Sequence, residues 1–159
     1  IEHMLEGPTD HERIAALDAY LRSLRPIPSP WLDPSRPIEV PAGRSDCQLC
    51  HDPARPRGAL NAAARRGREL FRGKAGCVEC HPPPWFTTMR SADPGLGNGI
   101  EYDIPSLLEV WRTAPYLHDG SAPTLRETIH DFNPQQRRGR TRELSEQELD
   151  DLVEYVRSL

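Results

Sequence analysis

The sequence predicts an all-α fold, and three observations support this prediction. Apolar residues recur at helical spacing near both ends of the chain, in residues 12–24 and 147–159. No convincing strand pattern appears between these two segments. Two strings of the form Cys-x-x-Cys-His, at residues 47–51 and 77–81, use all four cysteines of the chain. We therefore expect short helices that pack around whatever the two strings bind.

The N-terminal part is predicted to hold one helix, in residues 7–24, with Asp10 as its cap. Residues 1–6 contain His-Met-Leu-Glu, which is typical of a cloning remnant, so we exclude them from the fold. The helix shares Leu, Tyr, Arg, Ser and Leu with the C-terminal helix at an offset of 135 residues. This repeat suggests that residues 7–24 are the tail of a preceding domain, although two amphipathic helices of similar composition can also look alike by chance.

Residues 25–58 are predicted to form a linker. Eight prolines lie between residues 25 and 57, where little periodicity is visible. This composition favours an extended chain. The first Cys-x-x-Cys-His string lies inside this segment, and no helix immediately precedes it. We therefore assign the first string to a proline-rich extension.

Residues 59–159 are predicted to form one helical domain. Its first helix begins after the cap Asn61 and ends near residue 72, where glycines stop it before Cys77. A loop rich in proline and glycine follows at residues 82–102. Three further helices are expected, at residues 105–111, 124–132 and 145–159. The last two have capping boxes, formed by Thr124 with Glu127 and by Ser145 with Glu148.

Both strings have the spacing of covalent c-type haem attachment. Two thiols separated by two residues can reach the two vinyl groups on one edge of a porphyrin, and the histidine that follows then lies under the iron as an axial ligand. The sequence therefore predicts two haems. The residues predicted to hold them are Cys47, Cys50 and the proximal ligand His51 for the first, and Cys77, Cys80 and the proximal ligand His81 for the second.

A helix, a short glycine turn and a haem string form the opening of a class I cytochrome c. The predicted fold class is therefore a class I cytochrome c-like helical domain packed around covalent haem, with a proline-rich N-terminal extension that carries a second haem motif. Only 36% of the residues are apolar, and the chain has 17 prolines. A bound haem would compensate for the small apolar content, because its macrocycle would serve as part of the core.

Other uses of the four cysteines remain open. Two Cys-x-x-Cys pairs are also the frame of a four-cysteine zinc site, although such a site needs no histidine after either pair. Two structural disulfides would each close only a tiny loop and would stabilise the fold little. A redox-active dithiol is the third alternative. The histidine after each pair favours haem over all three.

Charge and hydropathy restrict the partners and the compartment. The net charge of −4 argues against nucleic acid as a partner. No stretch of about 18 apolar residues is present, so we expect no membrane span. Because c-type haem is attached outside the cytoplasmic membrane, we expect the protein in the periplasm or at the cell surface of a bacterium. A signal peptide is not visible in this sequence.

Several runs in the second half of the chain resemble one known family. They are Arg-Gly-Arg-Glu-Leu-Phe at residues 66–71, Trp-Phe-Thr at 85–87, Ile-Pro-Ser-Leu-Leu-Glu-Val-Trp at 104–111 and Thr-Ala-Pro-Tyr-Leu-His-Asp-Gly-Ser-Ala-Pro-Thr-Leu at 113–125. Together they resemble the C-terminal cytochrome domain of the bacterial di-haem cytochrome c peroxidase and MauG-like family. The resemblance covers about residues 60–159. It implies a helical cytochrome c fold and redox work, either electron transfer or peroxide chemistry.

The sequence departs from the family pattern in two stretches. Residues 91–95 lack the histidine that members commonly carry after the haem string, and residues 99–103 lack the methionine that many place before the Pro-Ser/Thr-Leu motif. The distal ligand of the second haem is therefore open. Candidates are Met89, which would give a high potential, Tyr102, which would favour oxidised iron, and His118, which could instead support the pocket by hydrogen bonding.

The distal ligand of the first haem is also open. His11 and His130 are the remaining candidates, although their positions near helix ends favour solvated surface residues over ligands. A basic run at residues 137–142 could dock an acidic redox partner or a haem propionate, although such runs are usually solvated loops.

We hypothesise a di-haem cytochrome domain that transfers electrons to a redox partner protein or an adjacent haem domain, as a module of a larger peroxidase-like or multi-haem protein. The alternatives are a peroxidase-like enzyme whose second haem is open or tyrosine-ligated, and a zinc-binding interaction module.

Overall fold

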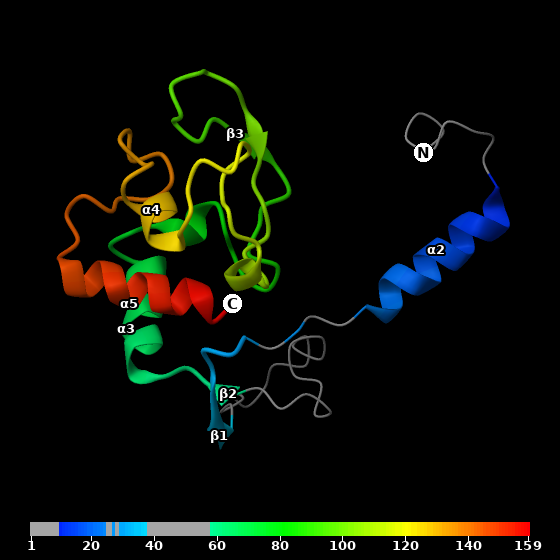
Figure 1. Ribbon diagram of the computed structural model, residues 1–159, viewed down its shortest axis with the longest axis horizontal. Helices are drawn as coiled ribbons and strands as arrows, with labels where there is room; N and C mark the ends of the chain where they lie inside the picture. The colour runs from blue at the N-terminus through cyan, green and yellow to red at the C-terminus, as the bar shows by residue number, and fades with distance from the viewer. Residues whose placement is uncertain (1–9, 25–26, 28, 38–57) are drawn as a thin grey trace.

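The computed structural model describes residues 10–24, 27, 29–37 and 58–159 (Figure 1). Helices carry most of the regular structure, and two very small sheets accompany them. The helices are α2 (His11–Ser23), α3 (Ala62–Arg72), α4 (Leu125–Ile129) and α5 (Glu146–Arg157), with the 3-10 turns η1 (Cys77–Glu79) and η2 (Val110–Arg112). The strands are β1 (Asp33–Pro37), β2 (Gly58–Ala59), β3 (Ser91–Ala92) and β4 (Tyr102–Asp103).

The centre of the fold is the crossing of α3 and α5 (Figure 1). The two helices approach closely at Gly67, where an added Cβ would lie 1.9 Å from the backbone oxygen of Asp151. Beside the crossing, the Arg66 guanidinium donates two hydrogen bonds of 2.6 Å to the carboxylate of Asp151. A residue without a side chain is therefore required where the helices cross.

An apolar core surrounds this crossing. Phe71 and Leu152 are almost fully buried, with 1% and 0% of their surface exposed. The Phe71 ring packs edge-on against Tyr155, with 5.2 Å between centroids, and against Phe86, with 6.1 Å. Phe86 lies in the loop that follows the second Cys-x-x-Cys-His string. The core therefore connects the terminal helix to the candidate haem site.

The predicted helix caps are observed. The Asn61 side chain accepts a hydrogen bond from the backbone N–H of Ala64 at the start of α3. Ser145 and Glu148 form the complete capping box of α5. The α4 cap is partial, because Thr124 accepts from the Glu127 backbone while the Thr124 hydroxyl donates to the Glu127 carboxylate.

The expectation that the chain contains no strands was wrong. β1 pairs antiparallel with β2, and β3 pairs antiparallel with β4. In the second pair the Ser91 hydroxyl donates a 2.8 Å hydrogen bond to Asp103. β2, β3 and β4 have only two residues each, too few to show an alternating pattern, and the five residues of β1 include two prolines and no alternation of apolar residues.

Two predicted helices are shorter than expected. In place of a helix over residues 105–111, the structure has only η2, because Glu109 has a left-handed conformation with φ of 59°. The preceding residues bond to the haem-string loop instead, as in the 2.6 Å hydrogen bond from the Ser106 hydroxyl to the Trp85 carbonyl. α4 ends at Ile129 rather than near residue 132.

The N-terminal helix α2 lies apart from the α3–α5 crossing (Figure 1). None of its residues is buried. By contrast, residues 29–31 contact the C-terminal part of the chain: the Ser29 hydroxyl donates to the Arg157 carbonyl at 2.6 Å, and Trp31 packs on Trp111 with 5.9 Å between ring centroids. The domain boundaries proposed from the sequence stay a prediction. No helix in the described ranges is both long enough and apolar enough to cross a membrane.

Candidate functional site

The second Cys-x-x-Cys-His string forms one tight turn after α3. Gly76 has a left-handed conformation with φ of 70° and leads into η1. The backbone N–H of His81 donates a 2.9 Å hydrogen bond to the Cys77 carbonyl. Both thiols and the imidazole therefore lie on a single turn, as attachment to one porphyrin edge requires.

The two thiols of this turn are free and partly buried. Burial is the largest cause that raises the pKa of Cys77, to about 12. A thiol with such a pKa remains protonated at neutral pH, whereas redox exchange needs a thiolate. The raised pKa therefore does not favour Cys77 as the reactive thiol of a redox-active dithiol.

The His81 ring is oriented by a backbone carbonyl. Its Nδ1 lies 2.8 Å from the Phe86 oxygen, and because a carbonyl only accepts, Nδ1 carries the proton. Burial is the main cause that lowers the pKa of His81. A neutral imidazole with a protonated Nδ1 leaves the Nε2 lone pair for a metal. This arrangement, in which one ring nitrogen is tied to a carbonyl, is typical of metal-binding histidines.

A C-terminal loop covers the string from the other side. Gly139 has φ of 101°, and a Cβ there would lie 3.0 Å from the Ala75 oxygen and 3.2 Å from Cys77 Sγ. The next residue, Arg140, donates its backbone N–H to the Ala75 carbonyl at 2.8 Å. The loop therefore packs directly against Cys77.

Two buried polar residues, Asn133 and Thr141, determine the shape of this loop; 1% and 0% of their surface is exposed. The Asn133 amide donates to the Gly139 carbonyl at 2.8 Å and accepts from the Arg138 N–H at 3.1 Å. The Thr141 hydroxyl donates to the Ile129 carbonyl at 3.1 Å. We call these contacts the Asn133 clamp. The sequence analysis missed the clamp, and the Asn-Pro pair at the end of α4 is the turn signal that could have indicated it.

Three partly buried side chains have buried polar atoms without a hydrogen-bond partner within the described residues. They are the Thr88 hydroxyl, the Trp111 indole N–H and the guanidinium of Arg138. Buried polar groups are nearly always satisfied in folded proteins. A haem carries an apolar ring together with two carboxylates, so it can bury apolar surface and accept hydrogen bonds at the same site. The residues present therefore fit a haem.

Two of the distal candidates are in contact with each other. The rings of Tyr102 and His118 stack with 4.4 Å between centroids and 32° between planes. The Tyr102 hydroxyl also accepts a 3.0 Å hydrogen bond from the amide of Asn98. Met89 differs from both, since 80% of its surface is exposed.

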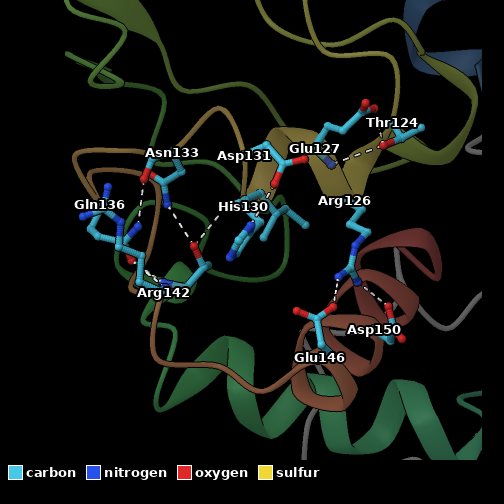
Figure 2. Close-up of polar contacts among 12 residues, drawn as sticks. Thr124, Arg126, Glu127, His130, Asp131, Asn133, Gln136, Arg142, Glu146 and Asp150 are labelled. Atoms are coloured by element: carbon cyan, nitrogen blue, oxygen red, sulfur yellow. Dashed lines mark hydrogen bonds and ion pairs between the residues drawn. The ribbon is translucent and has the colours of Figure 1, made fainter.

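The remaining predicted site residues lie at helix ends or outside the described residues. His11 is the first, exposed residue of α2. His130 caps the end of α4, and its Nδ1 lies 2.9 Å from the Asp131 carboxylate (Figure 2). The first string, with Cys47, Cys50 and His51, lies outside the described residues. The four-cysteine zinc alternative needs two of these residues and is therefore not tested by the structure.

Comparisons with known proteins agree with a cytochrome. A family model described as "RoxA-like, cytochrome c-like" matches residues 101–140. Among curated proteins, hydrazine synthase subunit gamma of Kuenenia stuttgartiensis is 31% identical over 149 aligned residues, which cover 64% of this chain and 42% of that protein. The methylamine utilization protein MauG of Methylorubrum extorquens is also 31% identical, over 64% of this chain and 35% of its own. Cytochrome c551 peroxidase of Nitrosomonas europaea is 29% identical, over 65% and 36%.

The fold is also similar to that of a solved structure. The chain superimposes on Kuenenia stuttgartiensis hydrazine synthase with a TM-score of 0.65 and 26% identity, over 94% of this chain and 56% of the other. The chain spans about two fifths of the length of the curated relatives. The family implies covalently bound c-type haem. These comparisons support a cytochrome c-like domain similar to the domains of cytochrome c peroxidases and MauG.

Proposed function

We propose that the chain is an electron-transfer cytochrome domain with haem attached to Cys77 and Cys80 and with His81 as the proximal ligand. The observation that carries this proposal is the His81 ring, whose Nδ1 is tied to the Phe86 carbonyl while Nε2 is left for iron. When bound, the haem iron supplies a one-electron redox couple. The chain's own residues hold the ligand neutral, orient it and bury it.

The proposal includes a second haem on Cys47 and Cys50, with His51 as its proximal ligand. Its support is the repeated Cys-x-x-Cys-His spacing. His11 and His130 are the proposed distal candidates. A His/His haem has a low reduction potential, so it would relay electrons to or from the haem at His81.

Haem counting tests both attachments. We expect the absorbance of the reduced pyridine adduct to show two haems per chain after expression with haem-attachment machinery. Replacing both cysteines of one string, in Cys77→Ser with Cys80→Ser or in Cys47→Ser with Cys50→Ser, should leave one haem each time. A single haem in the parent protein would contradict the di-haem proposal. A colourless protein with bound zinc would instead support the zinc-binding module.

We further propose that the domain works outside the cytoplasmic membrane as part of a larger redox protein. The periplasmic chemistry of c-type haem attachment and the greater length of the relatives support this placement. In this proposal α2 is the last helix of a preceding domain, as its sequence repeat with α5 suggests. The partner is a redox protein or an adjacent haem domain.

A peroxidase-like activity is the second candidate function. The Tyr102–His118 stack favours it over a His/Met electron-transfer site, because Tyr102 is partly buried and Met89 is exposed. Electron paramagnetic resonance of the oxidised protein should change in Tyr102→Phe and stay unchanged in the control Met89→Leu if Tyr102 is the distal ligand. Mixing the ferric protein with peroxide tests the activity. No spectral change and no turnover with an electron donor would contradict it.

A further inference from the structure

The basic run at residues 137–142 separates into two kinds of arginine in the structure. Arg137 and Arg140 are exposed and pair with acidic side chains, with Arg137 at 2.6 Å from Asp93 and Arg140 at 3.3 Å from Glu79. All three guanidinium nitrogens of Arg138 are buried, and none has a hydrogen-bond partner in the described part of the chain. Arg138 is therefore the member of the run that needs an explanation.

The backbone of Arg138 is held next to the haem string. Its N–H donates to the Oδ1 of Asn133, which is almost fully buried. The following residue is Gly139, where an added Cβ would lie 3.2 Å from Cys77 Sγ. The Asn133 clamp therefore determines where this side chain begins, one residue from the glycine that packs against the cysteine proposed to carry haem.

A buried guanidinium without a partner is unfavourable. Burial lowers the pKa of Arg138, yet arginine remains protonated in proteins, so the site cannot avoid the cost by losing its charge. An isolated buried cation costs several kcal/mol unless an anion or a set of acceptors compensates it. The planar fork of donors matches two oxygens of one carboxylate or a small anion. The missing partner is therefore an anion.

We propose that Arg138 is an anion-binding residue beside the Cys77–Cys80 turn. The anion is either a carboxylate of the attached haem or a small inorganic anion that enters from solution. The chemistry of recognition is the same for both sources, a charge-assisted hydrogen bond from the guanidinium. The proposal rests on haem attachment at Cys77 and Cys80.

The first experiment tests the haem carboxylate. We compare the midpoint potential of the haem-loaded protein with that of Arg138→Gln, Arg138→Lys and the matched control Arg137→Gln, between about pH 5 and pH 9. Without the guanidinium, an uncompensated carboxylate stabilises ferric iron. Arg138→Gln should therefore lower the potential and make it more dependent on pH, Arg138→Lys should restore part of the change, and Arg137→Gln should behave as the parent.

The second experiment tests an entering anion. Ferric protein is titrated with sodium fluoride and followed by absorbance, with the same variants. Loss of a charge-assisted hydrogen bond should weaken fluoride binding about tenfold in Arg138→Gln and leave it unchanged in Arg137→Gln. A change in potential alone assigns the haem carboxylate, and a change in fluoride affinity assigns the entering anion. If neither differs from the control, the proposal is overturned.

A stability measurement covers the case in which the glutamine variant loads poorly. Arg138→Met replaces the guanidinium by an apolar chain of similar length. If Arg138 were unpaired, its removal would raise the denaturation midpoint of the haem-loaded protein, which would overturn the proposal; pairing with an anion predicts a decrease. Haem content is measured in every sample. A parent protein without haem on Cys77 and Cys80 contradicts the proposed function, whereas loaded variants that match the control contradict this inference alone.

Discussion

The helices α2 and α5 have nearly the same apolar pattern and opposite environments. At the offset of 135 residues, Leu17 corresponds to Leu152, and Leu21 corresponds to Val156. The exposed fractions are 48% against 0% for the first pair and 55% against 4% for the second. The pattern determines which face of a helix can be buried, but it does not determine whether that face is buried.

The difference comes from the partner helix. α5 crosses α3 at Gly67 and packs Tyr155 on Phe71, whereas no residue of α2 is buried against any described part of the chain. Burying an apolar side chain of this size is worth about 1.5–3 kcal/mol. Most of the stability of a protein helix comes from such packing rather than from helix propensity. Substitutions at matched positions of the two helices, and at the crossing of α5 with α3, can therefore separate the two environments.

The largest effect is expected at the paired leucines. Leu152→Ala should lower the free energy of unfolding by about 3 kcal/mol, because it removes a fully buried side chain and leaves a cavity. Leu17→Ala, at the equivalent position of α2, should change it by less than about 0.5 kcal/mol. Urea denaturation of the haem-loaded protein, followed by circular dichroism, measures both. Equal losses would show that α2 is packed in solution and would remove the contrast.

Gly67→Ala tests the close approach of α3 and α5. In an exposed helix this substitution stabilises by about 1 kcal/mol, because alanine has the higher helix propensity. Here the new Cβ would meet the backbone of Asp151 at 1.9 Å, so we expect a loss of about 2 kcal/mol. Thermal unfolding measures the sign of the change. A rise in the melting temperature would mean that the two helices are not in close contact.

The N-cap of α5 should contribute more to global stability than the N-cap of α2. Ser145→Ala should cost about 1 kcal/mol of global stability, since Ser145 caps a helix that is part of the core. Asp10 caps α2 in the same way, by accepting from Glu12 and Arg13. Asp10→Ala should reduce helicity in circular dichroism without moving the main unfolding transition. A shift of that transition by Asp10→Ala would argue that α2 unfolds together with α5.

The smallest effect is expected in the pH dependence of the melting temperature at acid pH. The pKa of Glu148 is lowered mainly by the Ser145 backbone N–H and also by Lys74. Because this pKa is lowered in the folded state, ionised Glu148 stabilises the fold above its usual pKa of about 4.5. This stabilisation is lost as the pH falls through the pKa of the folded state. Glu148→Gln should therefore flatten the pH dependence of the melting temperature below about pH 4.5. The equivalent residue of α2 is Arg13, and Arg13→Gln should leave that dependence unchanged.

Local signals predicted the helices well where the caps were strong. α2, α3 and α5 begin after Asp10, Asn61 and Ser145 as expected. The prediction failed over residues 105–111, where Pro105 and Ser106 resemble a helix start but the chain bonds to the loop at Trp85 and Phe86. Those bonds join residues about twenty positions apart, so no local pattern contains them.

At the candidate site, too, the local sequence indicated which residues matter, and tertiary packing decided how they are arranged. The Cys-x-x-Cys-His spacing indicated Cys77, Cys80 and His81 without any structure. The orientation of the His81 ring depends on the Phe86 carbonyl, which the loop at residues 82–87 places only when it packs on Phe71. Tyr102 and His118 were separate alternatives in the sequence, and folding stacks them on each other.

By itself, the sequence determined the capped helices, the turn that carries both thiols, and the family of the domain, because each depends on residues within a few positions or on a string of fixed spacing. Only the tertiary structure decided which apolar helix is buried and which arginine of the basic run is buried. Arg137 and Arg138 are neighbours of the same type, and the Asn133 clamp and the approach of Gly139 to Cys77 separate them. Burial is a property of contacts between distant segments, and adjacent identical residues carry no local signal of it.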